Sequence, residues 1–183
     1  ELVMLIDTKN NLEIIARELS TETNFNGSKI QNENELLGFA KSVSFPSHAL
    51  ILRKAKDDNT GIIKGITQWG ALKRGFNLLQ KEYGTVYAET DMRAMYNPTR
   101  MQVIKQAAAK LIAQIQSLCP QCSTPGFAIT EVKQGLPCLW CGSATLSTLS
   151  HVYVCRKCNY TLEKKYPNNK TSEEPMYCQT CNP

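Results

Sequence analysis

Four pairs of cysteines in the last third of the chain constrain the fold more than any other feature of the sequence. Each pair is spaced C-x-x-C, and together they account for every cysteine present: Cys119, Cys122, Cys138, Cys141, Cys155, Cys158, Cys178 and Cys181. Two intervening residues allow a tight turn to direct both sulfurs at one ion, and two such turns supply the tetrahedral four-thiolate shell that zinc prefers. Eight ligands therefore predict two closed zinc sites with a structural role, since no position is left for substrate.

Other uses of these cysteines have less support. A secreted disulfide framework would need an export signal, and none is visible, although Glu1 is not an initiator residue. A thioredoxin-type redox pair needs one C-x-x-C rather than four in series. Iron bound by the same thiolates stays open as an alternative to zinc. Thiol-rich metal sites without an export signal are typical of a reducing compartment, so we expect a cytoplasmic protein.

Four preformed pairs can build two sites in three ways, and the sequence favours a nested arrangement. In that arrangement the inner pairs bind one ion (Cys138, Cys141, Cys155, Cys158) and the outer pairs bind the other (Cys119, Cys122, Cys178, Cys181). The thirteen residues between the inner pairs would form a two-stranded ribbon. Gly142, Asn159 and Asn182 follow the second cysteine of a pair, where a metal-binding turn commonly needs positive φ. Sequential pairing, first with second and third with fourth, is the alternative.

The charge of the chain does not indicate a nucleic-acid partner once metal is counted. The 183 residues carry a formal charge of +5, of which residues 118–183 contribute six Lys and Arg against four Asp and Glu. Eight thiolates and two Zn²⁺ ions turn the +2 of this region into about −2 and leave the whole chain near +1. No apolar run approaches the roughly 20 residues of a membrane span.

Ahead of the cysteines, apolar residues alternate between strand and helix patterns. We expect strands at 2–6, 12–19, 49–55, 62–66 and 85–91, the first of them buried, and a loop at 20–29. Turn residues at 8–11 and 57–61 predict that the first and second strands form one hairpin and the third and fourth another, although residues 12–19 also fit a helix pattern. Expected helices run from caps at Asn32, Thr67 and Asn97, the last with Met101, Ile104, Leu111, Ile112 and Ile115 on its buried face.

The expected fold class is accordingly α+β or α/β: a domain over residues 1–117 with a mixed sheet and three helices, then a zinc-ribbon module over residues 118–183. Because the chain begins inside an expected strand, we expect the natural protein to have a further N-terminal part.

One stretch outside the cysteines combines residues suited to phosphate and metal chemistry. Glu89 and Asp91 end an expected strand two residues apart, which puts their carboxylates on one face, and Arg93 follows. Arg100, Asn97 and Thr99 lie in the first turn of a helix, where free N–H groups favour an anion. We expect the two carboxylates to hold Mg²⁺, with the arginines and the helix start holding phosphate. An ion pair and an ordinary helix start would explain the same residues, and His48 is expected to be a packed or surface residue.

The same residues resemble a known family. The run ETDMRAMYNPTRM (89–101), the run SLCPQCSTPGF (117–127), the run GLPC (135–138) and the closing YCQTCNP (177–183) are similar to an uncharacterised bacterial family that is described only as a domain of unknown function. The resemblance covers essentially all 183 residues. It implies zinc-ribbon chemistry and no established activity. Longer members carry a further N-terminal segment that is faintly similar to house-cleaning nucleoside triphosphate pyrophosphatases.

Two functions follow as hypotheses. The first is a metal-dependent hydrolase that acts on a nucleotide or another phosphorylated small molecule and carries a structural zinc tail. The second is a non-enzymatic zinc-ribbon module that binds nucleic acid or a protein partner. The aromatic residues of the zinc-ribbon module have two interpretations. They pack around the metals, or they form a surface on which bases stack, and the latter would support the binding hypothesis. These residues are Phe127, Trp140, Tyr153, Tyr160, Tyr166 and Tyr177.

Overall fold

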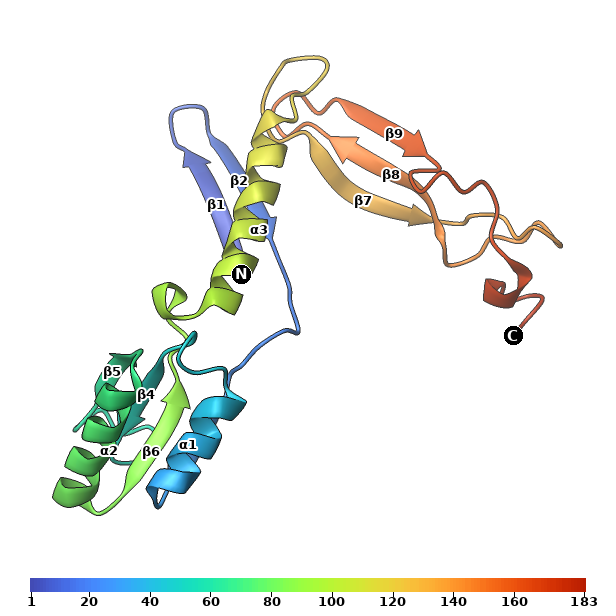
Figure 1. The fold of residues 1–183 in the computed structure, drawn as a ribbon. Coiled ribbons are helices and arrows are strands. Elements are labelled where there is room, and N and C mark those ends of the chain that lie inside the picture. Colours follow the sequence, from blue (N-terminus) through green and yellow to red (C-terminus); the bar gives the residue numbers. More distant parts are fainter. The chain divides into compact units, whose positions relative to one another are not determined.

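The computed structural model describes residues 1–183, which fold into two compact units (Figure 1). Unit 1 comprises residues 1–3 and 17–108, and unit 2 comprises residues 4–16 and 109–183. The chain has the three expected α-helices together with antiparallel sheets, so the fold class is α+β. None of the helices combines the length and apolar character needed to span a membrane.

Unit 1 is built on a four-stranded sheet. Its strands are β3 (Gly27–Ile30), β4 (Leu50–Arg53), β5 (Ile63–Ile66) and β6 (Val86–Thr90), in the order β3-β6-β4-β5. Every pairing is antiparallel, so the expected mixed sheet is wrong. The expected hairpin of β4 and β5 is confirmed. Strand β3 lies within the segment expected to be a loop, because its pairing with β6 outweighs the weak strand propensity of Gly27-Ser28-Lys29.

Two helices supply the rest of the core of unit 1. Helix α1 (Glu33–Ser42) starts at the expected cap, where the Asn32 side chain accepts a hydrogen bond from the Glu35 backbone N–H. Helix α2 (Trp69–Tyr83) starts after Gln68 rather than Thr67 and ends at Gly84, whose φ of 70° is the left-handed conformation of a helix C-terminus. Their apolar stripes pack with alternate residues of β4 and β6: Leu36, Ala40, Leu72, Phe76, Leu79, Leu50, Leu52, Val86 and Ala88.

Strands β1 (Leu2–Asp7) and β2 (Leu12–Arg17) form the expected hairpin, closed by the turn at residues 8–11. The expectation that the first strand is buried is wrong, because Leu2, Met4 and Ile6 are all at least half exposed. The continuous apolar run of β1 indicated burial on both faces, whereas in the structure its residues alternate between exposed and half-buried. On β2 only Ile14 and Ala16 are buried.

Helix α3 (Pro98–Gln116) begins as expected: Asn97 Oδ1 accepts the backbone N–H of Arg100, and Pro98 occupies the first helical position. Its expected buried face is confirmed only in part. Ile104, Leu111 and Ile115 are half-buried. Met101 and Ile112 are about half exposed, and the one fully buried residue of the helix is Ala107.

Unit 2 contains a three-stranded antiparallel sheet of β7 (Ala128–Gln134), β8 (Thr148–Val154) and β9 (Thr161–Lys165), in that order (Figure 1). One strand separates each cysteine pair from the next along the chain. Because consecutive antiparallel strands reverse direction, the first and third pairs come to one end of the sheet and the second and fourth pairs to the other. This alternation positions both candidate metal centres.

Candidate metal centres

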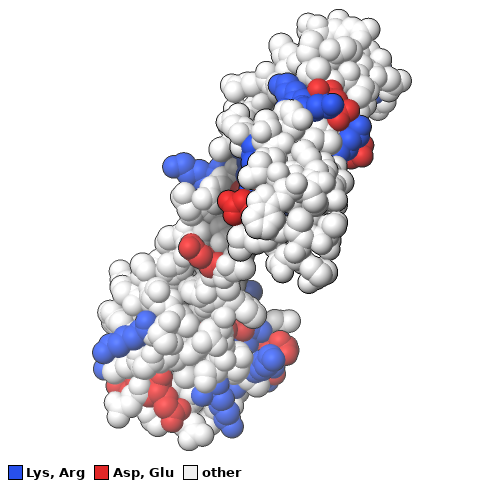
Figure 2. Space-filling view, turned by 90° about the vertical axis from the view of Figure 1, so that its right-hand side faces the viewer, with Lys and Arg blue, Asp and Glu red and all other residues white.

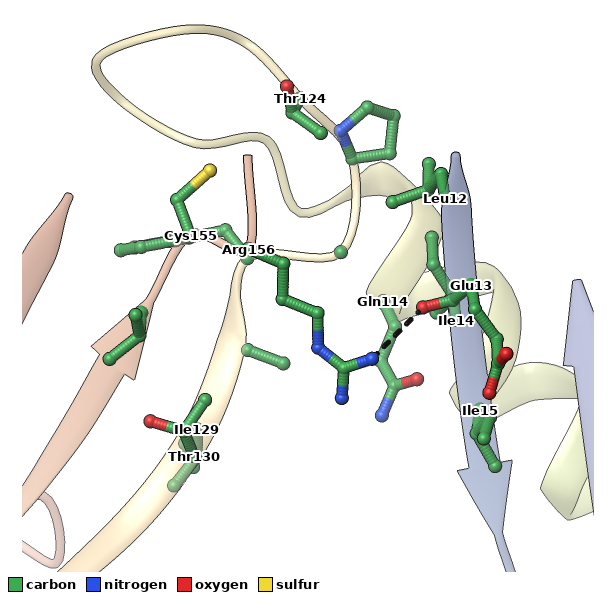
Figure 3. A pocket seen from close by; sticks show the side chains of 15 residues that line it. Leu12, Glu13, Ile14, Ile15, Gln114, Thr124, Ile129, Thr130, Cys155 and Arg156 are labelled. Atoms are coloured by element: carbon green, nitrogen blue, oxygen red, sulfur yellow. Dashed lines mark hydrogen bonds between the residues drawn. The ribbon is translucent and has the colours of Figure 1, made fainter. Parts of the chain in front are cut away.

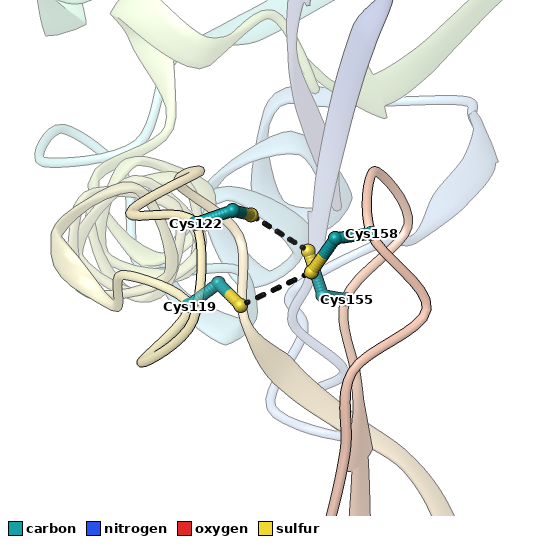
Figure 4. Close-up of side chains that lie close together, drawn as sticks. All are labelled: Cys119, Cys122, Cys155 and Cys158. Carbon is teal, nitrogen blue, oxygen red and sulfur yellow. Dashed lines mark hydrogen bonds between the residues drawn. The ribbon is translucent and has the colours of Figure 1, made fainter.

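The eight cysteines form two clusters of four, one at each end of the sheet of unit 2. The first site consists of Cys119, Cys122, Cys155 and Cys158, whose sulfurs converge (Figure 4). The second site consists of Cys138, Cys141, Cys178 and Cys181. Within each site the four sulfur atoms all lie within 4.8 Å of one another. Each site is thus made by two C-x-x-C turns that face each other.

The sulfur separations fit tetrahedral zinc. Four thiolates at about 2.3 Å from a central ion are about 3.8 Å apart. In the first site Cys119 and Cys158 are 3.7 Å apart and Cys122 and Cys155 are 3.6 Å apart. The corresponding distances in the second site are 3.9 Å between Cys138 and Cys181 and 3.6 Å between Cys141 and Cys178. All eight cysteines are free thiols, since disulfide sulfurs would lie at about 2.0 Å.

The nested pairing expected from the sequence is wrong. The first C-x-x-C pair joins the third and the second joins the fourth, so the two sites interleave along the chain. The nested expectation depended on a two-stranded ribbon between Cys141 and Cys155. That interval instead contributes the single strand β8, which pairs with β7 on one side and β9 on the other. A single strand carries the chain to the opposite end of the sheet, whereas a ribbon would have returned it to the same end.

The metal-binding turns share one local hydrogen-bond pattern. In each turn the residue after the second cysteine donates its backbone N–H to the carbonyl of the first, at 2.8–3.0 Å. Gly142 and Asn159 have φ of 73° and 57°, as expected for this position. Ser123 also has a positive φ, which its residue type did not indicate. Asn182 was expected to have a positive φ and does not. These turns form locally, which is why the ligands themselves were predictable.

One thiol in each site is strongly disposed to ionise. Hydrogen bonds from the side chain and backbone of Thr124 lower the pKa of Cys122 to about 6. Ser143 acts in the same way on Cys141, whose pKa is also lowered to about 6. Zinc binds thiolates and releases their protons, so a thiol that is already ionised at neutral pH assists metal binding.

The first site is enclosed by aromatic side chains. Phe127 is buried and lies 5.6 Å from the Tyr153 ring and 5.9 Å from the Tyr160 ring, measured between centroids. These rings and Leu162 pack with the cysteines of this site in one apolar cluster. For Phe127, Tyr153 and Tyr160, packing around the metal site is therefore the structural role.

A small cavity borders the first site (Figure 3). It measures about 130 Å³ and lies between β2, the end of α3 and the first residues of β7. The Arg156 guanidinium donates to the Glu13 carbonyl oxygen at 3.4 Å across it, and the amide oxygen of Gln114 is buried without a partner. Ligand sites for small molecules usually have about 300–1,000 Å³, so this cavity is too small for a nucleotide.

The second site has a polar support that the sequence did not reveal. Glu173 is buried and its carboxylate accepts hydrogen bonds from Ser147 Oγ at 2.6 Å and from the Glu174 backbone N–H at 2.8 Å, and it also pairs with Lys170. These bonds lower the pKa of Glu173 to about 2, with the Lys170 hydrogen bond as the largest cause. The backbone of Glu173 bonds Pro137 and Leu139, and so ties the turn at Cys138 to the C-terminal segment. No local pattern distinguishes Glu173 from a surface glutamate.

The two acidic residues expected to hold Mg²⁺ are each paired with a different arginine of unit 1. Glu89 forms an ion pair with Arg53. Asp91 is fully buried and accepts hydrogen bonds from the Gly65 N–H at 3.1 Å and from Arg93 Nε and Nη2 at 2.9 and 2.6 Å. Burial alone would raise the pKa of Asp91, but the Arg93 hydrogen bonds outweigh it and the pKa is lowered. Both carboxylates thus serve ion pairs, and the arrangement gives no support for Mg²⁺.

The N-terminal N–H groups of α3, expected to bind phosphate, already have protein partners. The Arg100 N–H bonds Asn97 Oδ1 at 2.9 Å, and the Thr99 N–H lies 3.4 Å from Nε2 of the buried His48. His48 Nδ1 lies 3.0 Å from Ser47 Oγ. Because the Ser47 hydroxyl donates to the Ser44 carbonyl, its oxygen accepts from Nδ1–H and leaves Nε2 as the acceptor at the helix start.

A cleft of about 280 Å³ in unit 1 brings three of the expected phosphate ligands together. It is lined by Asn97, Thr99 and Arg100 but not by Glu89, Asp91 or Arg93. Its wall also contains Glu1, Glu18 and Glu22, and the Arg100 guanidinium donates to Glu1 at 2.7 Å. An acidic lining that already neutralises the arginine does not favour a phosphorylated ligand.

The chain belongs to the family described as domain of unknown function DUF6671, whose sequence profile matches residues 1–183. This confirms the resemblance found in the acidic-arginine run and in the cysteine motifs. Comparison with curated proteins and with solved structures found no match. The family description states no activity, so a function has to be argued from the geometry.

Paired cysteine substitutions test the interleaved sites. We expect Cys119→Ser/Cys155→Ser to retain one zinc per chain, because both changes fall in the first site, and Cys119→Ser/Cys178→Ser to retain none. The measurement is elemental analysis by mass spectrometry after dialysis against a mild chelator. Nested pairing predicts the reverse, and sequential pairing predicts no zinc in either variant. Iron in place of zinc would show in the same measurement.

Substitution of Asp91 tests whether its ion pair is structural. Asp91→Asn should lower the free energy of unfolding by about 2 kcal/mol, because it removes a buried charge and leaves donors of Arg93 and Gly65 poorly matched. Its lowered pKa means that the contribution is present above the usual aspartate pKa of about 3.9 and shrinks as the pH falls below it. Urea unfolding followed through Trp69 in a Trp140→Phe background measures both effects.

The matched control is Lys73→Ala, which removes an exposed ion pair with Glu33 and should cost less than about 1 kcal/mol. Equal costs for the two variants would contradict a structural role for the buried pair.

Proposed function

We propose that the chain is a non-enzymatic binding module, held in shape by two structural zinc ions, that recognises a protein partner through the exposed turns of the second site. The observation that carries this proposal is the contrast between the two sites. Aromatic side chains cover the first site, whereas the turns of the second site present their apolar side chains to solvent. Zinc would be held by the eight cysteines and would supply rigidity rather than a reaction centre.

The proposed recognition surface consists of four side chains that flank cysteines of the second site: Leu139, Trp140, Met176 and Tyr177. Trp140 is 79% exposed and Leu139 66% exposed, although both lie inside a metal-binding turn. Tryptophan and tyrosine dominate the binding energy at protein interfaces, and methionine adapts to varied partners. A rigid turn that displays such residues loses little conformational entropy on binding.

Charge favours a protein over a nucleic acid as the partner. Residues 135–147 and 175–183, which form the turns of the second site, contain no Lys, Arg, Asp or Glu. A zinc ion with four thiolates carries a charge of about −2, which repels phosphates and attracts a basic group. On the face shown in Figure 2, basic and acidic side chains are interspersed rather than gathered into a basic surface. The matching partner is a peptide with apolar side chains beside Lys or Arg.

The hydrolase hypothesis has less support. The carboxylates of Glu89 and Asp91 are engaged by arginines, and the N–H groups at the start of α3 bond Asn97 and His48. A metal-dependent hydrolase would need these groups to be free for Mg²⁺ and phosphate. We therefore treat phosphate release from a nucleotide panel with Mg²⁺ as an outcome that would favour the other hypothesis.

The binding proposal is tested by panning a random 12-residue peptide library against the zinc-loaded chain. We expect enrichment of peptides that combine apolar and basic residues. A synthetic consensus peptide should then change Trp140 fluorescence in a Trp69→Phe background. Its affinity, measured by the anisotropy of a fluorescently labelled peptide, should fall roughly tenfold or more in Trp140→Ser, because the removal of one central aromatic anchor typically costs about 2 kcal/mol.

The control variant is Val132→Ser, which removes a half-exposed apolar side chain of β7 outside the turns and should leave the affinity unchanged. Both variants must retain two zinc ions. Enrichment of no peptide, or tighter binding of single-stranded oligonucleotides with a steep salt dependence, would contradict the proposal.

A further inference from the structure

The two sites differ in how far their sulfur ligands are reachable from solvent. Cys119 and Cys155 of the first site are buried and Cys122 and Cys158 are half-buried. In the second site Cys141 and Cys181 are exposed, although Cys138 and Cys178 are buried. Each exposed cysteine is the second member of its pair, so each turn of this site has one solvent-exposed cysteine.

The surroundings reinforce this difference. The first site is packed by Phe127, Tyr153 and Tyr160. The turns of the second site have no such aromatic enclosure, and Leu139 and Trp140 between Cys138 and Cys141 are exposed. The shell around a metal site controls the access of solvent and reagents to its ligands. Thiolates that are exposed and uncovered are the ones that oxidants reach first.

We propose that the second site is an oxidation-sensitive zinc site, in which a peroxide converts exposed Cys141 and a neighbouring thiolate to a disulfide and releases the ion, while the first site keeps its zinc. The inference shares with the proposed function the premise that both sites bind zinc, and it adds a modification site and a condition under which the recognition surface is lost.

The reaction balances with hydrogen peroxide as the oxidant. The Cys141 thiolate attacks one peroxide oxygen, the O–O bond breaks, and a sulfenic acid forms while hydroxide leaves and takes up a proton. The Cys178 thiolate, whose sulfur lies 3.6 Å away, then attacks the Cys141 sulfur, so that an S–S bond forms and a second hydroxide leaves as water. Sulfur loses two electrons and peroxide gains two. A site left with two thiolates no longer has the four ligands that hold structural zinc.

Loss of this ion would remove the recognition surface. Leu139 and Trp140 lie between Cys138 and Cys141, and Met176 and Tyr177 lie directly before Cys178, so the metal fixes the backbone that displays all four. The rest of unit 2 would retain the first site and the pairing of β7 with β8. Oxidation is therefore expected to switch the surface off without unfolding the chain.

Zinc release from the full chain tests the proposal. Protein loaded with two zinc ions is treated with hydrogen peroxide, and a chromogenic chelator reports the free ion. We expect one equivalent to be released roughly tenfold or more faster than the other. Peptide mapping should place the disulfide among the cysteines of the second site, and a thiol reductant with added zinc should restore the loaded form. A Met176→Leu background removes the methionine nearest to the cysteines of the second site, so that its oxidation does not affect the measurement.

Variants assign the two phases. Cys138→Ser/Cys178→Ser should abolish the fast phase, and Cys119→Ser/Cys155→Ser should abolish the slow one. Phe127→Ala should accelerate the slow phase, because it opens the aromatic enclosure of the first site. If these variants fold poorly, maleimide labelling of the zinc-loaded wild type gives the same answer: Cys141 and Cys181 should react first.

Release of both ions at one rate, or a first disulfide among the cysteines of the first site, would overturn the inference. A chain that binds two zinc ions but releases them together would leave the proposed binding function intact. A chain that binds fewer than two would contradict both.

Discussion

The convergence of eight cysteines into two clusters is the constraint on which the C-terminal half of the structure depends. The sheet of unit 2 has little core: β7 has no buried residue, and β9 has none either. The buried residues near this sheet are mainly at its ends. They are cysteines and the aromatic side chains around Cys119 and Cys155. A sheet with so little buried apolar area would be marginal alone. Thiolate ligation of zinc contributes about 10 kcal/mol or more in small zinc folds, which is enough to replace a core.

Unit 1 is stabilised in the ordinary way, and this difference bears on where function can lie. Its sheet and two helices share one apolar core, and the buried polar residues near the start of α3 are hydrogen-bonded. Asp91 binds Arg93 and Gly65, and His48 binds Thr99 and Ser47. Polar groups committed in this manner fix the loop before α3 and are not free to bind substrate. The proposed binding surface instead uses the exposed apolar side chains on the turns of the second site, Trp140 foremost among them.

The limits of sequence-based prediction follow the same division between local and long-range structure. The cysteine ligands and the caps at Asn32 and Asn97 were predictable, because residues at fixed short spacing determine them. The pairing of the sites was not, because it depends on whether one strand or two lie between Cys141 and Cys155. The exposure of Met101 and Ile112 on α3 and the burial of Glu173 were missed for a related reason, since burial depends on what packs against a residue and not on its neighbours in sequence.

Interleaving has a consequence for how the two sites affect each other. Zinc in the first site would close the chain from Cys119 to Cys158, and zinc in the second would close it from Cys138 to Cys181, so both loops would contain residues 138–158 and strand β8. Each ion would then constrain a segment that the other also constrains, and β8 would stay tethered when either ion is lost. Sequential sites would close residues 119–141 and 155–181 separately and would leave strand β8 outside both loops. The topology thus allows the exposed end of unit 2 to lose its metal while the enclosed end preserves the strand pairing from which the site can be rebuilt.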